Sequence, residues 1–127
     1  MNNHESEENY LETILMLSLK GERVRSIDIV NELEFSKPSV SVAMKNLRAK
    51  NYIVMDDEGN ITLTKKGRKI ADSIYERHVA ISDWLTGLGV DRKTAAQDAC
   101  KMEHAMSEKS FLAIKNHIAA CKQDASV

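Results

Sequence analysis

The order of secondary-structure signals in the first half of the chain constrains the fold most. Apolar residues recur at helical spacing through residues 7–19, through a short stretch after Ser26, and again through residues 37–50, where Val40, Met44 and Leu47 are spaced to point inward. Two short β-forming runs follow, residues 52–55 and 61–64, and they flank an acidic Asp-Asp-Glu-Gly-Asn turn that is typical of a hairpin. This order of helix, short helix, tight connection, helix and hairpin predicts a winged helix-turn-helix.

The second half of the chain has the pattern of a helical domain. We expect a long helix over residues 65–85, a break at Gly87 and Gly89, and two further helices capped by Asp91 and Ser107. Ser6 is the expected N-cap of the first helix. The sequence therefore predicts a mainly α protein with a winged helix-turn-helix over residues 1–70 and a helical domain over residues 71–127.

Composition excludes few classes of function. The chain has 127 residues, of which 43% are hydrophobic and 29% charged, the balance of an ordinary globular protein. No apolar run approaches the roughly 20 residues that span a bilayer, and the polar, acidic N-terminus shows no signal peptide. Cys100 and Cys121 lie far apart and match no CxxC pair, which argues against a disulfide framework or a zinc ribbon. We expect a cytoplasmic protein without a membrane partner.

The third predicted helix has a polar face suited to DNA. A helix of this kind fits the major groove, about 12 Å wide, with serine hydroxyls toward phosphates or base edges and basic side chains toward phosphates. The candidate DNA contacts on this helix and at the start of the next are Ser36, Lys37, Pro38, Ser39, Ser41, Lys45, Arg48, Lys65 and Lys66. The acidic hairpin tip would repel phosphate, so we expect it to brace the domain. A small helical domain with a solvated lysine face would show the same pattern.

The fifth predicted helix carries three potential metal ligands. Offsets of three and four residues place Cys100, Glu103 and His104 on one helical face. A thiolate, a carboxylate and an imidazole together suit a first-row transition metal. Asn9 and Glu12 share a face of the first helix in the same way. Plainer interpretations remain open, because a helical cysteine is often a small buried hydrophobe and a Glu-His pair is often solvated.

His78 is a separate candidate ligand. It interrupts the apolar stripe of the long helix, where an imidazole needs a partner. A hydrogen-bonded core histidine would explain it equally well.

Three segments resemble the diphtheria toxin repressor family, which contains the iron-dependent regulators and the manganese transport regulators. They are SEENYLETI at residues 6–14, SKPSVS at 36–41 and DACKMEHAMS at 98–107, and the likeness extends over about residues 6–118. The resemblance implies a homodimeric repressor that is activated by Fe(II) or Mn(II) and binds palindromic operators of metal-uptake genes. It also implies a second domain that binds metal and dimerises. We expect the short form of the family, without the SH3-like third domain of many iron regulators, an architecture that resembles the manganese branch.

The resemblance implies roles for single residues as well. The residues that match metal-ligand positions are Cys100, Glu103, His104, His78 and Glu12, and Asn9 occupies a further such position. The iron branch also has cysteine at the position of Cys100, whereas Glu12 matches a ligand of the manganese branch. Asn9 stands where the iron branch has methionine and the manganese branch aspartate, so this chain departs from both. An ancillary site of the iron branch needs a glutamate and a histidine where this chain has Ser82 and Ala96, so we do not expect that site in its usual form.

The donor set favours Fe(II) over Mn(II), because Mn(II) prefers oxygen ligands and this chain has a thiolate and lacks the aspartate. The proposed ligands come from the first, fourth and fifth helices. We therefore expect metal to tie the DNA-binding domain to the dimerisation domain and to fix the spacing of the two recognition helices in the dimer.

Three other functions compete with this interpretation. A metal-independent winged-helix regulator would make the cluster at Cys100 replaceable. An enzyme is disfavoured, because no oxyanion hole, phosphate loop or paired catalytic carboxylates accompany Cys100 and His104. A metal-storage or trafficking protein would leave the helix-turn-helix unexplained.

Overall fold

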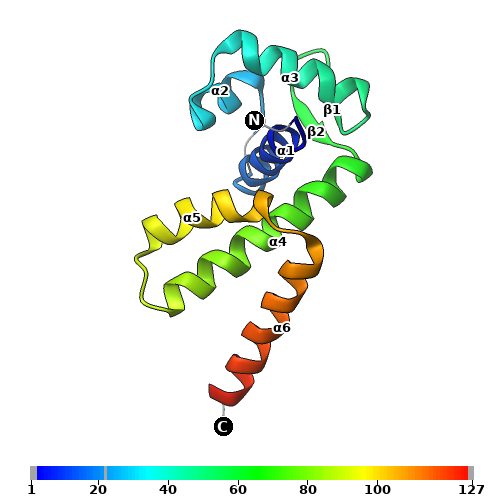
Figure 1. Ribbon diagram of the computed structural model, residues 1–127. Helices are drawn as coiled ribbons and strands as arrows, with labels where there is room; N and C mark the ends of the chain where they lie inside the picture. The colour runs from blue at the N-terminus through cyan, green and yellow to red at the C-terminus, as the bar shows by residue number, and fades with distance from the viewer. Residues whose placement is uncertain (1–2, 22, 126–127) are drawn as a thin grey trace. The chain divides into compact units, whose positions relative to one another are not determined.

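The computed structural model describes residues 3–21 and 23–125, with side chains for residues 6–21 and 23–121 (Figure 1). The helices are α1 (Asn3–Leu19), α2 (Ser26–Leu33), α3 (Lys37–Ala49), α4 (Lys65–Gly87), α5 (Arg92–Ala105) and α6 (Glu108–Ala125), and the strands are β1 (Ile53–Met55) and β2 (Ile61–Leu63). The chain divides into two compact units, Met1–Ser73 and Ile74–Val127, which we call the first and the second unit. The predicted order of elements is confirmed.

α1 supplies a large part of the core of the first unit. Tyr10, Leu11, Ile14 and Leu15 are buried, and the Tyr10 ring meets the Phe35 ring edge-on with 5.9 Å between centroids. The prediction that Ser6 caps α1 is wrong, because the helix begins at Asn3 and Ser6 lies inside it. No glycine or proline precedes Ser6 to stop the helix, so it extends toward the N-terminus.

Ser36 begins α3, the predicted recognition helix. The backbone N–H of Ser39 donates to the Ser36 hydroxyl over 3.2 Å, which satisfies one of the free donors of the first turn. Val40, Met44 and Leu47 are buried, as their spacing predicted. Because these apolar side chains face the core, the serine and lysine side chains on the other face of α3 are exposed to solvent.

The β-hairpin is short. Ile53 pairs with Leu63 and Met55 with Ile61, so each strand has three residues, fewer than the sequence predicted. Asp56 closes the turn by accepting the backbone N–H groups of Glu58 and Asn60. These hydrogen bonds, chiefly the one from Asn60, hold the pKa of the Asp56 carboxyl below its usual value. The acidic tip is thus a turn closed by hydrogen bonds to Asp56.

The start of α4 lies against the hairpin. The Thr64 hydroxyl accepts the backbone N–H of Gly67 and donates to the carbonyl of Asn51. Gly67 is buried, and a Cβ atom at this position would collide with the backbone carbonyl of Tyr52. Only glycine therefore allows this close approach between the helix and the chain that enters β1.

The second unit is built from the later part of α4, α5 and α6. Ile81, Ala99 and Phe111, one from each helix, form its buried core, with Leu85 and Met102 packed against them. Asp91 caps α5 by accepting the backbone N–H of Thr94 over 3.0 Å, which confirms the predicted cap. The helix that carries the candidate ligands is therefore fixed at its start.

Among the helices that the structure describes, none is long and apolar enough to cross a membrane.

Candidate metal centre

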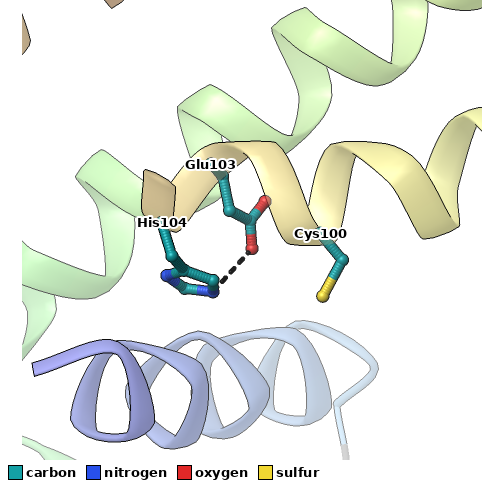
Figure 2. Close-up of side chains that lie close together, drawn as sticks. All are labelled: Cys100, Glu103 and His104. Carbon is teal, nitrogen blue, oxygen red and sulfur yellow. Dashed lines mark ion pairs between the residues drawn. The ribbon is translucent and has the colours of Figure 1, made fainter. Parts of the chain in front are cut away.

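The last two turns of α5 hold three potential metal ligands. Cys100, Glu103 and His104 each offer one donor atom, and these atoms lie within 4.8 Å of one another. Figure 2 shows the three side chains on the same side of α5, with the carboxylate between the sulfur and the imidazole. The helical offsets predicted this grouping, and the second unit contains it.

Glu103 is the centre of this group. Its side chain has no exposed surface, and one carboxylate oxygen lies 3.2 Å from Nε2 of His104. The other carboxylate oxygen lies 3.1 Å from Nδ1 of His78, which projects from α4. A carboxylate so deeply buried needs hydrogen bonds or positive charge around it, and two imidazoles supply that environment.

The donors fit a divalent transition metal. The side chain of His104 is 4% exposed and that of His78 is 20% exposed, while Cys100 is partly buried. Cys100, Glu103 and His104 can supply a thiolate, a carboxylate oxygen and an imidazole nitrogen from a single helix, because their side chains share one face of α5. Among the described residues, this cluster brings a soft sulfur donor and a hard oxygen donor close together within the second unit.

Asn9 and Glu12, the remaining candidate ligands, belong to α1 in the first unit. Glu12 is buried, with 4% of its surface exposed, and Asn9 is partly buried. The structure thus groups Cys100, Glu103, His104 and His78 within the second unit. The participation of Asn9 and Glu12 stays a prediction.

The candidate DNA contacts form an exposed set in the first unit. Exposed side chains are found at Ser36, Lys37, Pro38, Ser39, Ser41, Lys45, Arg48, Lys65 and Lys66. The ammonium group of Lys66 lies 5.1 Å from the centroid of the Tyr52 ring, which orients this lysine. The polar side of α3 and the first residues of α4 are therefore open to a ligand.

Comparison with known proteins identifies the family. Residues 4–60 match the N-terminal DNA-binding domain of iron-dependent repressors, and residues 64–126 match their metal-binding and dimerisation domain. An uncharacterized HTH-type transcriptional regulator of Methanocaldococcus jannaschii is 33% identical over 113 residues, which cover 87% of this chain and 90% of that protein. The chain belongs to the iron-dependent repressor family, the family of the diphtheria toxin repressor.

Other members of the family show the same likeness. The transcriptional regulator MntR of Escherichia coli O157:H7 is 32% identical over 108 residues, 85% of this chain and 70% of that protein. The solved manganese regulator SloR superposes with a TM-score of 0.78 at 27% identity over 89% of this chain and 53% of that one. The chain thus spans about half the length of SloR. The predicted fold, a winged helix-turn-helix followed by a helical domain, is confirmed.

Sequence reasoning missed one residue that contacts the candidate metal centre, Arg77. Its guanidinium donates to the backbone carbonyls of Glu103 and Met106 over 3.0 and 2.8 Å. The same group lies 5.2 Å from the centroid of the Phe111 ring. Arg77 is separated from these partners by at least 26 residues, so no local pattern could have revealed the contact.

Proposed function

We propose that this chain is a repressor that binds palindromic operators of metal-uptake genes as a homodimer when a divalent metal, Fe(II) in preference to Mn(II), is bound. The observation that carries the proposal is the convergence of Cys100, Glu103, His104 and His78. It occurs in a chain whose residues 4–60 match a DNA-binding domain. We propose a functional boundary near residue 70, with DNA binding before it and metal binding and dimerisation after it.

The proposed ligands have distinct roles. Cys100, Glu103 and His104 supply one donor atom each, and their shared helix face keeps those atoms close together before any cation binds. His78 contacts Glu103 directly, so it either adds a donor or orients that carboxylate. We assign Glu12 and Asn9 to the same centre from the family resemblance. The burial of Glu12 is consistent with a carboxylate that faces a cation.

The choice of Fe(II) rests on the donor chemistry. A bound metal supplies a fixed positive charge among these donors. The Cys100 thiolate is a soft ligand, and an amide at Asn9 is a weaker hard donor than a carboxylate. Both features reduce the preference for Mn(II), which is best held by carboxylates and carbonyls.

Manganese is the second candidate, and a specific observation favours it. The relatives named above include regulators called MntR and a manganese regulator, SloR. Anaerobic titrations of the same protein with Fe(II) and Mn(II), each at buffered free concentrations, decide between them. The physiological metal is the one that supports DNA binding within the free concentration range found in cells.

The DNA-binding role rests on α3. Its buried side is occupied by Val40, Met44 and Leu47, so the exposed serines and lysines are the groups available to bases and phosphates. Two copies of this helix in a symmetric dimer would read half-sites about 34 Å apart in two successive major grooves. This geometry is the reason for proposing a palindromic operator.

The dimer surface is assigned to the second unit. Leu88 and Leu112 are 67% and 47% exposed there, although they are large apolar side chains. Ile114 and Ile118 of α6 and Trp84 of α4 are partly buried and can extend this apolar surface. Burial of such a surface against a second copy of the chain would remove it from water.

Glu103→Ala tests the ligand assignment. The control is Glu108→Ala, which removes an exposed carboxylate from the first turn of α6 in the same unit. Fluorescence anisotropy on operator DNA should show metal-dependent binding for the wild type and the control, and none for Glu103→Ala. Circular dichroism and gel filtration establish that the variant is still a folded dimer. Metal-dependent DNA binding by folded Glu103→Ala would refute the assignment.

A further inference from the structure

Arg77 connects α4 to the C-terminal end of α5, where two of the proposed ligands lie. α5 ends at Ala105, and its C-cap residue Met106 has extended backbone angles, φ −104° and ψ 150°. The last four carbonyls of a helix have no partner within the helix itself. The Arg77 guanidinium donates to one of these carbonyls, that of Glu103, and to the carbonyl of Met106 just beyond the helix.

Its planar group is also held from the side. The guanidinium carbon lies 5.2 Å from the centroid of Phe111, a buried core residue of α6. Arginine stacks well on aromatic rings and presents its donors in a rigid fork. Arg77 therefore joins the end of α5, the connection that follows it and the first turns of α6.

The residue next to Arg77 also contacts Glu103. His78 follows Arg77 in α4 and reaches the carboxylate of Glu103 at 3.1 Å. One residue of α4 thus holds the backbone of Glu103 and the next contacts its side chain. A proposed ligand that is fixed at both points loses little freedom when it binds a cation.

We infer that Arg77 is a positioning residue for the metal centre, which holds the Glu103–His104 turn of α5 in the geometry that the donors need. This inference rests on the proposed function, since it concerns the same site. Arg77 donates to backbone carbonyls and packs on the Phe111 ring, so it acts on the metal centre through the ligands that it positions. The family resemblance pointed only to ligand positions; this role comes from the contacts of Arg77 itself.

The test compares three variants of the full chain. Arg77→Met keeps the aliphatic stem and removes the donors, Arg77→Lys keeps the charge without the planar fork, and Arg92→Met removes an exposed arginine from the other end of α5. Co(II) is the probe, because binding to the Cys100 thiolate gives a thiolate-to-metal absorption band. Hydrogen exchange of the metal-free proteins reports how firmly the end of α5 is held.

We expect Arg77→Met to weaken Co(II) binding about 10- to 100-fold, the usual effect of removing a group that orients a ligand. Arg77→Lys should lie between Arg77→Met and the wild type, and Arg92→Met should match the wild type. Without metal, the amides of residues 103–107 should exchange faster in Arg77→Met, while those near the Asp91 cap are unchanged. A fall in overall stability alone would accelerate exchange at both ends of α5.

Two different failures are distinguishable. If the wild type shows no thiolate band with Co(II), the proposed metal site is refuted, and this inference with it. If the wild type shows the band and Arg77→Met binds Co(II) within twofold of it, only the inference about Arg77 is refuted. Should Arg77→Met fail to fold, Arg77→Lys carries the test, and equal affinity in Arg77→Lys and the wild type overturns the inference.

Discussion

Glu103 has no exposed surface on its side chain, yet it carries a carboxylate with an imidazole near each oxygen. Burial of a charge is costly unless polar groups or a cation surround it. Side chains with such environments gather at functional sites more often than in ordinary cores. Among single residues, Glu103 therefore has the environment that most supports a metal site, and we propose that the Cys100 thiol sets which metal the site prefers.

Replacement of Cys100 should change metal selectivity. Cys100→Asp exchanges a soft donor for a hard one, so the ratio of Mn(II) to Co(II) affinity should rise about tenfold or more, in line with ligand softness. Competition titrations with a metal-sensitive dye measure both affinities. Cys121→Asp, at an exposed position on α6, is the control and should leave the ratio unchanged. An unchanged ratio in Cys100→Asp would mean that this thiol is no ligand.

Among the helices, the N-terminal caps fix the elements that carry the candidate DNA contacts and the candidate metal ligands. Ser36 caps α3, the proposed recognition helix, and Asp91 caps α5, which carries the candidate ligands, so one polar side chain fixes the start of each helix. Gly67 has a comparable role at the first turn of α4, where backbone approaches backbone.

Ser36→Asp separates the capping role of this residue from its proposed DNA contact. Aspartate caps helices about as well as serine, so thermal stability should be unchanged. A negative charge facing phosphate should weaken operator binding at least about tenfold, because like-charge contacts at an interface cost on the order of kcal/mol. Anisotropy measures the affinity. Ser107→Asp, which changes the cap of α6, should bind DNA like the wild type. Equal affinity for both variants would remove Ser36 from the DNA surface.

Gly67→Ala should destabilise the first unit. The added methyl group collides with the Tyr52 carbonyl, and overpacking of this kind typically costs about 1–3 kcal/mol. Gly87, the last residue of the same helix, has open space around its Cα, so Gly87→Ala should leave stability unchanged or slightly raised. Urea denaturation compares the free energies of unfolding. A Gly67→Ala protein as stable as the wild type would contradict the close contact.

The Asp91 cap makes part of the stability depend on pH. The backbone N–H of Thr94 donates to this carboxylate and lowers its pKa below the ordinary 3.8. A carboxyl with a lowered pKa in the folded state stabilises the fold fully above its ordinary pKa, and this contribution is lost as pH falls through the folded value. In Asp91→Asn the side chain still caps the helix but does not titrate. The free energy of unfolding of this variant should therefore fall less than that of the wild type below about pH 4. Denaturation experiments at pH 7 and pH 3 measure the free energy of unfolding of each protein. Asp83→Asn, at an exposed position on α4, should follow the wild type.

At the scale of the whole molecule, periodicity and caps predicted a large part of the fold. The spacing of Val40, Met44 and Leu47 identified the buried face of α3, and Asp91 marked the start of α5 correctly. Ser6 failed as a start signal because helix-permitting residues precede it. Offsets within one helix also predicted the grouping of Cys100, Glu103 and His104.

Contacts between distant segments were beyond sequence reasoning. His78 was singled out as a polar residue in an apolar stripe, but its contact with Glu103, 25 residues away, depends on how α4 packs against α5. Arg77 gave no signal, because its partners are backbone carbonyls, which every residue carries. The structure supplies these connections through tertiary packing.

The most direct test of metal control is anaerobic fluorescence anisotropy of the full chain on DNA from upstream of its own gene and of neighbouring metal-uptake genes. Fe(II), Mn(II) and a chelated control are compared at constant ionic strength, because phosphate contacts make affinity depend strongly on salt. We expect specific binding only with metal, and removal of the metal by chelator should release the DNA. Tight, specific binding in the chelated sample would contradict metal control. Cys100, Glu103 and His104 would then contribute to core packing only.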